Sequence, residues 1–133
     1  MPPADLANCR VLVVEDEFLI ASLVEDMLAD LGCEVVGPEG ALAAAMKLAR
    51  EEAIDLAVLD VTIRGGQVFP VAEILLERGV PFILASGYGD LALPDAFRGG
   101  PRLTKPFNAA ELERALHAAR AVAGWPPGSP DAH

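Results

Sequence analysis

The sequence lacks the features of a membrane, secreted or nucleic-acid-binding protein. No apolar run approaches the roughly 20 residues that a bilayer span requires, and residues 1–5 carry neither the basic nor the apolar region of a signal peptide. Only ten Lys and Arg stand against twenty Asp and Glu, for a net charge of −10, so most of the surface would repel nucleic acid and anionic lipid. We therefore expect a cytoplasmic protein with protein partners, no direct nucleic-acid contact and no membrane insertion.

Cysteine is scarce as well. The two present, Cys9 and Cys33, would lie near the amino ends of neighbouring strands, where a disulfide is geometrically conceivable. A reducing cytoplasm favours two free buried thiols instead, and we assign them no function.

The chain is too short for two domains of ordinary size. Its 133 residues, 53% of them hydrophobic, suffice for one packed domain, which we place at residues 9–123. Residues 124–133 are rich in proline and glycine and are expected to form an unstructured C-terminal tail. Any output would pass through the surface of this single domain.

Five short β-rich runs alternate with helical stretches along the chain. This alternation is typical of an α/β fold with a doubly wound, five-stranded parallel sheet. The expected strands are Arg10–Val14, Cys33–Gly37, Asp55–Asp60, Pro81–Ala85 and Pro101–Thr104.

Glycine and proline mark the expected helix ends. Apolar side chains recur at helical spacing over residues 17–31, and Gly32 follows where a helix C-terminus favours a left-handed residue. Pro70 suits the first turn of a third helix, which Gly79 would end.

The remaining helices differ in how clearly they are marked. One is expected over residues 40–52, and Asn108 and Glu111 have the spacing of a capping box that opens the last helix. Residues 88–100 contain Pro94 and several glycines, which predict a short or broken fourth helix. Three phenylalanines are assigned to the core rather than to a site: Phe18, Phe82 and Phe107.

Charged side chains stand at the ends of three predicted strands. Glu15 and Asp16 follow the first, Asp60 ends the third, and Lys105 follows the fifth. The carboxyl ends of parallel strands share one edge of the sheet, so these groups would converge there. Ser86, which follows the fourth strand, would join them.

Each of these residues has an ordinary explanation when taken alone. The acidic pair after the first strand could interact only with a helix dipole, Asp60 could be a turn residue, and Lys105 could be a solvated surface lysine. Their coincidence at three strand ends, together with Ser86, favours a functional site.

The expected chemistry of this site is phosphoryl transfer to an aspartate. Three crowded carboxylates repel one another unless one takes up a proton or a cation intervenes, and oxygen ligands with room for water suit Mg²⁺. Asp60 is the best nucleophile, because it ends a buried run and opens a loop at the sheet edge, and a carboxylate can form an acyl phosphate. Lys105 would supply positive charge and Ser86 a hydroxyl to the transferring group.

The chain resembles the receiver domains of two-component response regulators over about residues 9–123. The pieces that carry the resemblance, in chain order, are Val14-Glu15-Asp16-Glu17, Leu59-Asp60, Ala85-Ser86-Gly87 and Thr104-Lys105-Pro106-Phe107. It implies a flavodoxin-like fold with strand order 2-1-3-4-5. It also implies a signalling switch that catalyses only its own phosphorylation and dephosphorylation, rather than an enzyme.

The resemblance further implies a role for each site residue. Asp60 would accept a phosphoryl group from a histidine kinase or phosphotransfer protein. Asp16 would bind Mg²⁺ directly, Glu15 would help through water, and Thr62 would contribute its backbone carbonyl. The phosphorylated form would change its affinity for a downstream protein partner. The catalytic residues would be Asp60, Ser86 and Lys105, and the metal site would comprise Glu15, Asp16, Asp60 and Thr62.

The chain departs from the family pattern in the residues of the switch. Ser86 would move toward the phosphoryl group, and family members usually couple that movement to an aromatic residue three positions before the lysine, where this chain has Arg102. The segment Leu84-Ala85-Ser86-Gly87-Tyr88 resembles the Phe-Ala-Thr-Gly signature of the atypical FAT GUY receivers, many of which are stand-alone domains. Tyr88 is therefore a candidate substitute for the missing ring.

Three other functions could use some of these residues, but each fits them less well. A phosphatase with an aspartyl nucleophile would need an acid two residues after Asp60 as proton donor, where the chain has Thr62. A flavodoxin-like module for a flavin or nucleotide phosphate would need a glycine- or hydroxyl-rich first loop, and residues 15–17 are all acidic. A dimerisation scaffold that takes no phosphate would not need the acidic trio and the lysine.

Overall fold

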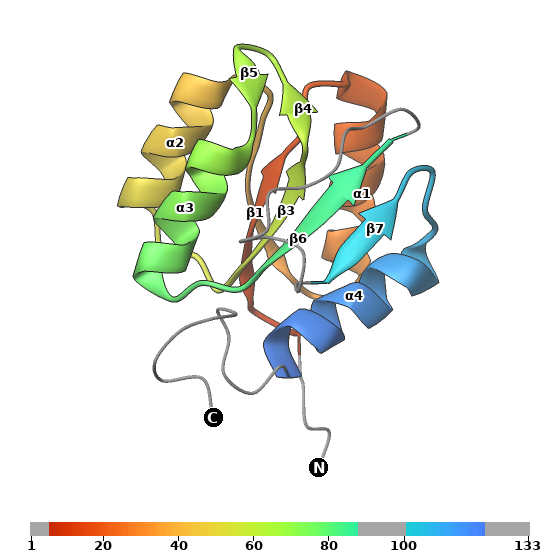
Figure 1. Cartoon of the computed structure of the whole chain (residues 1–133). Helices are drawn as coiled ribbons and strands as arrows, with labels where there is room; N and C mark the ends of the chain where they lie inside the picture. Colours follow the sequence, from red (N-terminus) through yellow and green to blue (C-terminus); the bar gives the residue numbers. More distant parts are fainter. Residues whose placement is uncertain (1–5, 88–100, 122–133) are drawn as a thin grey trace.

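The apolar runs form one parallel sheet covered by helices on both faces (Figure 1). The structure, a computed structural model, describes residues 6–87 and 101–121. The strands of the sheet are β1 Arg10–Val14, β2 Glu34–Glu39, β3 Leu56–Asp60, β6 Phe82–Ser86 and β7 Arg102–Thr104, and the helices are α1 Phe18–Asp30, α2 Leu42–Glu51, α3 Phe69–Arg78 and α4 Ala109–Ala121. The strands pair in the order β2-β1-β3-β6-β7. Since β6 and β7 are the fourth and fifth strands of this sheet along the chain, the predicted order and the flavodoxin-like α/β fold are confirmed.

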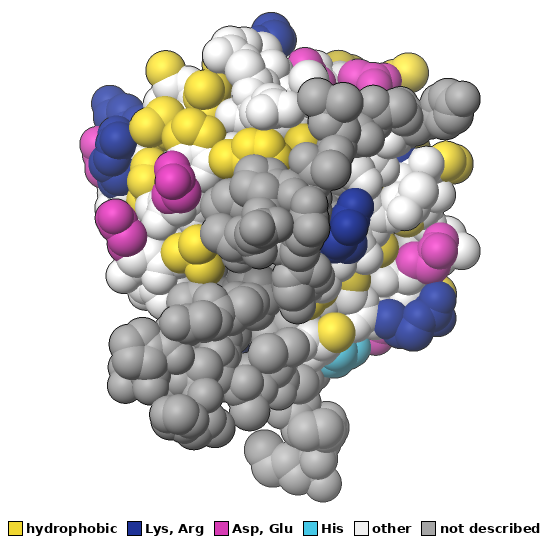
Figure 2. All heavy atoms as spheres, viewed as in Figure 1, with side chains coloured by type: hydrophobic (Ala, Val, Ile, Leu, Met, Phe, Trp, Pro, Cys, Tyr) yellow, Lys and Arg dark blue, Asp and Glu magenta, His cyan; other side chains and the backbone are white. Residues whose placement is uncertain are grey.

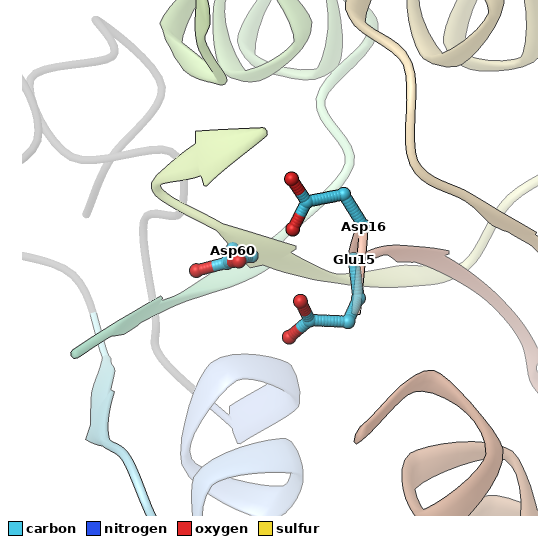
Figure 3. A group of neighbouring side chains, drawn as sticks. All are labelled: Glu15, Asp16 and Asp60. Atoms are coloured by element: carbon cyan, nitrogen blue, oxygen red, sulfur yellow. The ribbon is translucent and has the colours of Figure 1, made fainter. Parts of the chain in front are cut away.

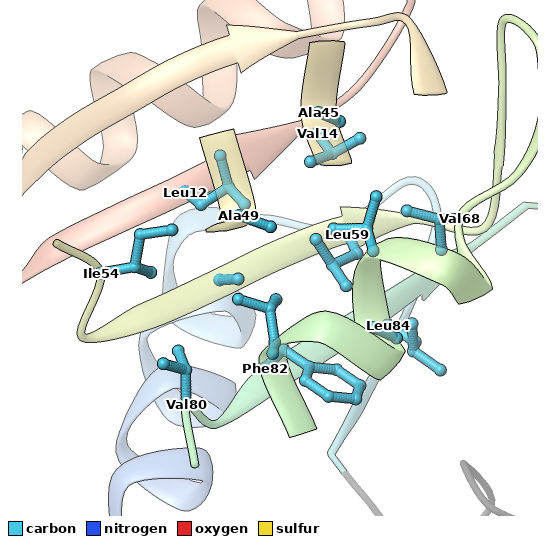
Figure 4. Packing of buried hydrophobic residues seen from close by; sticks show 14 of the residues in the cluster. Leu12, Val14, Ala45, Ala49, Ile54, Leu59, Val68, Val80, Phe82 and Leu84 are labelled. Atoms are coloured by element: carbon cyan, nitrogen blue, oxygen red, sulfur yellow. The ribbon is translucent and has the colours of Figure 1, made fainter. Parts of the chain in front are cut away.

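The core consists of two apolar layers, one on each face of the sheet. Alternate side chains of β1 supply both: Leu12 and Val14 join a cluster with α2 and α3, whereas Val11 and Val13 join a cluster with α1 and α4. Figure 4 shows part of the first cluster. Every residue of β3 is buried, as expected for a central parallel strand covered on both faces.

The predicted helix boundaries follow from local chemistry. Gly79 adopts the left-handed conformation at the end of α3 (φ 72°), and proline lies at the start of that helix. At the start of the last helix, the Glu111 backbone N–H donates to Asn108 Oδ1 at 2.8 Å, and the Asn108 N–H donates to Glu111 Oε1 at 3.0 Å. These reciprocal bonds are the predicted capping box.

Four of the five strands differ from the prediction by one or two residues at an end, and one element was not predicted. The second strand runs over Glu34–Glu39 rather than Cys33–Gly37. The loop after Asp60 contains a small antiparallel hairpin of β4 Thr62–Ile63 and β5 Gly66–Gln67. The sequence did not predict this hairpin, because strands of two residues are too short to show a periodic pattern. The expected fourth helix (88–100) and the expected tail (124–133) lie outside the described residues.

The phenylalanine assignments need one correction. Phe82 is buried and Phe107 is half-buried against the α1/α4 cluster, but Phe18 is 80% exposed. Phe18 opens α1 at the carboxyl edge of the sheet, one turn before Ala21, the first buried residue of that helix. With Leu19 (75% exposed) and Leu23 (56% exposed) it forms a set of exposed apolar side chains that we call the α1 apolar face.

Neither cysteine forms a disulfide. Cys9 and Cys33 are both buried and unbridged, as predicted, and they lie side by side because the Glu34 N–H donates to the Cys9 carbonyl at 2.7 Å.

The described surface carries mixed charge. On the face seen in Figure 2, acidic and basic side chains are interspersed, and neither sign forms a continuous patch. None of the helices in the described part of the chain combines the length and apolarity that a membrane span requires.

Candidate functional site

Parallel pairing brings the predicted site residues to one edge of the sheet. Glu15 and Asp16 follow β1, Asp60 ends β3, Ser86 ends β6, and Lys105 follows β7. The Lys105 backbone N–H donates to the Ser86 carbonyl at 2.8 Å, which holds the end of β7 beside β6. Segments up to ninety residues apart in the chain thus meet at the carboxyl ends of four strands.

Three carboxylates form the centre of this edge (Figure 3). One oxygen from each of Glu15, Asp16 and Asp60 lies within 4.8 Å of the others. Glu15 and Asp60 are each only 7% exposed, while Asp16 is half-buried. Hard oxygen donors with one side open to water are the ligands that Mg²⁺ prefers in proteins, so the donor set fits this cation.

Lys105 makes direct ion pairs with two of these carboxylates. Its Nζ lies 2.8 Å from Glu15 Oε1 and 3.0 Å from Asp60 Oδ2. Burial by itself would lower the pKa of Lys105, but the hydrogen bonds and charges of Glu15 and Asp60 together outweigh burial and raise it. The lysine therefore stays charged and bridges the two most buried carboxylates.

Asp60 is poised between its charged and neutral forms. Burial raises its pKa most, the hydrogen bond from Lys105 lowers it, and the charge of Glu15 raises it further, to about 7 in the metal-free protein. A cation beside the cluster would favour the ionised form, which is the nucleophilic one.

This pKa predicts how stability depends on pH without metal. The folded pKa of Asp60 exceeds the unfolded value of roughly 4, so between these pH values the folded state binds more protons and stability falls as pH rises. In EDTA, Asp60→Asn should be more stable than the wild type by up to roughly 4 kcal/mol at pH 8, since each pH unit between the two pKa values is worth about 1.4 kcal/mol, and about equally stable at pH 4. Urea unfolding at both pH values measures this. An Asn variant with the same advantage at pH 4 would show that the gain is not electrostatic.

The other predicted residues differ in how near they lie to this cluster. Ser86 is buried beside the cluster (9% exposed), and Thr62 is the exposed first residue of β4, two residues after Asp60. Arg102 is exposed on β7, in register with Leu84, and does not join the carboxylates. Tyr88 lies outside the described residues.

The sequence reasoning missed an apolar cavity next to the site. A hollow of about 310 Å³ lies between α1 and the segment after β7, and Lys105 contributes to its wall. Its other lining residues are Glu17, Ile20, Leu23, Met27, Pro106 and Phe107. The sequence did carry a signal for this cavity, because the apolar residues of α1 cover a wider face of the helix than the residues that are buried in the core.

A basic side chain beside the carboxylates was also missed. Arg64, in the turn of the β4–β5 hairpin, lines a second cavity of about 300 Å³ together with Glu15, Asp16 and Glu39. No local sequence signal could place it there, because its position depends on pairing between the hairpin and residues 40–42.

Comparison with known families matches most of the chain. A family model described as "Response regulator receiver domain" matches residues 11–117. The transcriptional regulatory protein PdtaR of Mycobacterium tuberculosis is 32% identical over 114 residues, which cover 83% of this chain and 56% of PdtaR. The chain thus spans little more than half the length of this relative.

Solved structures share the fold at similar coverage. The solution structure of SdrG from Sphingomonas melonis Fr1 is 40% identical, with a TM-score of 0.76, over 87% of this chain and 98% of that chain. Its BeF3-activated conformation is 41% identical, with a TM-score of 0.72, over 86% and 98%. The receiver domain of sensor histidine kinase PA1611 from Pseudomonas aeruginosa PAO1, solved with a magnesium ion in its active site cleft, is 23% identical, with a TM-score of 0.69, over 86% and 98%.

Proposed function

The chain belongs to the response regulator receiver domain family, and on this basis we propose that it is a Mg²⁺-dependent phosphoacceptor whose nucleophile is Asp60. Phosphorylation-based signalling is the function of the family. The observation that carries the assignment of the acceptor is Lys105, which contacts both Asp60 and Glu15 at the carboxyl edge of the sheet. Glu15 shares this lysine, but it lies beyond the last residue of β1, whereas Asp60 is itself the last residue of the fully buried central strand β3.

The residues around Asp60 suit an in-line phosphoryl transfer. A carboxylate oxygen of Asp60 would attack phosphorus as the bond between phosphorus and the donor nitrogen breaks, which yields an acyl phosphate and a free imidazole. Lys105 would pair with the phosphoryl oxygens, and the Ser86 hydroxyl would donate to them. Lys105 already contacts Asp60 in the unphosphorylated protein, which supports this role for the lysine.

The carboxylate cluster would hold the cation that this reaction needs. We propose that Asp16 and Asp60 bind Mg²⁺ directly, with Glu15 acting through water and Thr62 through its backbone carbonyl. A cation held there would supply positive charge that offsets the crowded carboxylates and favours the charge developing on the phosphoryl group. In its absence Lys105 carries out the neutralisation at Glu15 and Asp60.

Acetyl phosphate tests the proposed acceptor chemistry. With Mg²⁺ the protein should gain one phosphoryl group by intact-mass measurement, and hydroxylamine should remove it, as it does from acyl phosphates. A hydroxylamine-stable adduct would point to a serine or threonine instead. Sustained turnover of p-nitrophenyl phosphate would favour the phosphatase alternative.

We further propose that the natural donor is a histidine kinase or phosphotransfer protein that contacts the α1 apolar face. Phe18, Leu19 and Leu23 are exposed, and Leu23 also lines the apolar cavity whose wall includes Lys105, so a donor seated there would lie close to Asp60. Such a donor implies a cytoplasmic protein, which cell fractionation would test.

The α1 apolar face gives a prediction that separates donor contact from chemistry. Leu23→Ser should slow phosphotransfer from a protein donor by roughly tenfold or more, the effect expected of an apolar contact near the centre of an interface. Labelling by acetyl phosphate should not change, because the side chain does not touch the carboxylates. Equal losses with both donors would place the effect in the site rather than in docking.

The downstream switch is proposed to run through Ser86 and the Tyr88 segment, toward a protein partner. The usual aromatic position holds Arg102, which is exposed on β7 and stands apart from the carboxylates. Tyr88→Ala should therefore abolish the phosphorylation-dependent gain in partner binding, measured by pull-down, while Asp60 is still phosphorylated. If Arg102→Ala has that effect and Tyr88→Ala has none, the switch runs through β7.

A further inference from the structure

The loop that follows Asp60 is tied to a second loop of the site. Within the β4–β5 hairpin, Arg64 and Gly65 form the turn. The Arg64 N–H donates to the Gly40 carbonyl at 3.1 Å, and the Arg64 carbonyl accepts from the Leu42 N–H at 2.9 Å. Both backbone groups of Arg64 are thus bonded to the segment between β2 and α2, so the turn has a defined position.

This attachment brings the Arg64 side chain close to Asp16. A Cβ added at Gly40 would lie 2.8 Å from Asp16 Cα, 3.1 Å from Asp16 Cβ and 3.0 Å from Arg64 Nη2. The guanidinium and the Asp16 side chain therefore flank the same point in space. Gly40 is required here because any larger residue would separate the two segments.

The surroundings of Arg64 are strongly acidic. The cavity that it lines also includes Glu15, Asp16, Glu25 and Glu39, and Arg64 is its one basic residue among those described. Within residues 6–87 and 101–121, no carboxylate forms an ion pair with the Arg64 guanidinium at 4.0 Å or less. The guanidinium is thus close enough to act on the carboxylates through its charge, and it is not fixed to one of them.

We propose that Arg64 keeps the affinity of the metal site for Mg²⁺ low by holding a positive charge beside Asp16. The inference rests on the proposed function, because it assigns the divalent cation to the same carboxylates. In the metal-free protein the guanidinium offsets part of the repulsion among the carboxylates; when a divalent cation arrives, the two positive charges oppose each other. Arg64 is exposed, so water and salt limit the effect to a severalfold change rather than an abolition of binding.

The test is Mg²⁺ binding by the full chain with and without this charge. Arg64→Gln keeps the backbone bonds of the turn and should bind Mg²⁺ roughly three- to tenfold more tightly at low salt. Amide shifts or calorimetry during a Mg²⁺ titration measure this affinity. The advantage should shrink at high salt, and Arg64→Lys should behave like the wild type. Arg50→Gln, which makes the same charge change in the last turn of α2, should alter the affinity little. In EDTA, Arg64→Gln should also be less stable toward urea than the wild type.

Each outcome bears on the inference. Equal or weaker Mg²⁺ binding by Arg64→Gln, equal effects of Arg50→Gln, or no binding by either the wild type or Arg64→Gln would overturn it. Its failure is distinguishable from that of the proposed function: labelling of Asp60 without a change of affinity in Arg64→Gln removes only the role of Arg64. Tighter binding by that variant in a protein that takes no phosphoryl group removes only the acceptor.

Discussion

Asp60→Asn should take up no phosphoryl group from acetyl phosphate in the presence of Mg²⁺. An amide nitrogen or oxygen is a poor nucleophile and cannot form the acyl phosphate, so the loss should be complete rather than partial. The shape of the site should persist, because asparagine matches aspartate in size and Lys105 retains its contact with Glu15. Intact-mass measurement over a time course checks this result.

Asp55→Asn is the matched control for that substitution. Asp55 immediately precedes β3, at the opposite end from Asp60, and its side chain accepts a hydrogen bond from the Arg10 backbone N–H. The variant changes the same charge far from the carboxylate cluster, and it should be phosphorylated at the wild-type rate. Persistent labelling of Asp60→Asn, or equal loss in Asp55→Asn, would remove Asp60 as the acceptor.

Asp16→Asn should lose most of the affinity for Mg²⁺ and, with it, most of the phosphorylation. Asp16 is the half-buried member of the trio and is the proposed direct ligand whose carboxylate is not paired with Lys105. Loss of a direct ligand should weaken Mg²⁺ binding by at least the roughly 10–100-fold that removal of outer-shell partners costs. Titration of Mg²⁺ followed by amide shifts measures the affinity.

The same variant should be more stable than the wild type when no metal is present. Removing one of three crowded negative charges relieves repulsion, and this gain should disappear at saturating Mg²⁺. Asp26→Asn, an exposed substitution on α1 with the same charge change, is the control for bulk electrostatics. An unchanged Mg²⁺ titration in Asp16→Asn would exclude Asp16 from the metal site.

The sequence predicted those parts of the fold that depend on neighbouring side chains, such as a helix cap, or on an unbroken run of apolar residues that must be buried. Residues 56–59 read as part of a central strand because all four are apolar, and the structure buries all of them together with Asp60. The capping box of Asn108 and Glu111 needs only two side chains three residues apart, and both of its bonds are present. Convergence of the site residues then follows from the parallel sheet.

The parts that escaped prediction depend on contacts between distant segments. Phe18 and Leu23 have helical spacing like the buried residues of α1, but the sheet covers only the stripe of Ala21, Val24 and Leu28. The position of Arg64 depends on backbone pairing with residues 40–42. A pattern of residue types records apolar periodicity, but not which apolar face remains uncovered or where a turn docks.

Locating the phosphoryl group on the chain tests directly whether Asp60 is the acceptor. Protein phosphorylated by acetyl phosphate with Mg²⁺ would be reduced with borohydride, which converts an acyl phosphate to an alcohol, and then cleaved at arginine. We expect the change in the fragment of residues 51–64, at Asp60 and not at Asp55, and we expect none without Mg²⁺. A change at Asp55, a phosphoryl group on Ser86 that resists reduction, or labelling that is indifferent to Mg²⁺ would contradict this expectation.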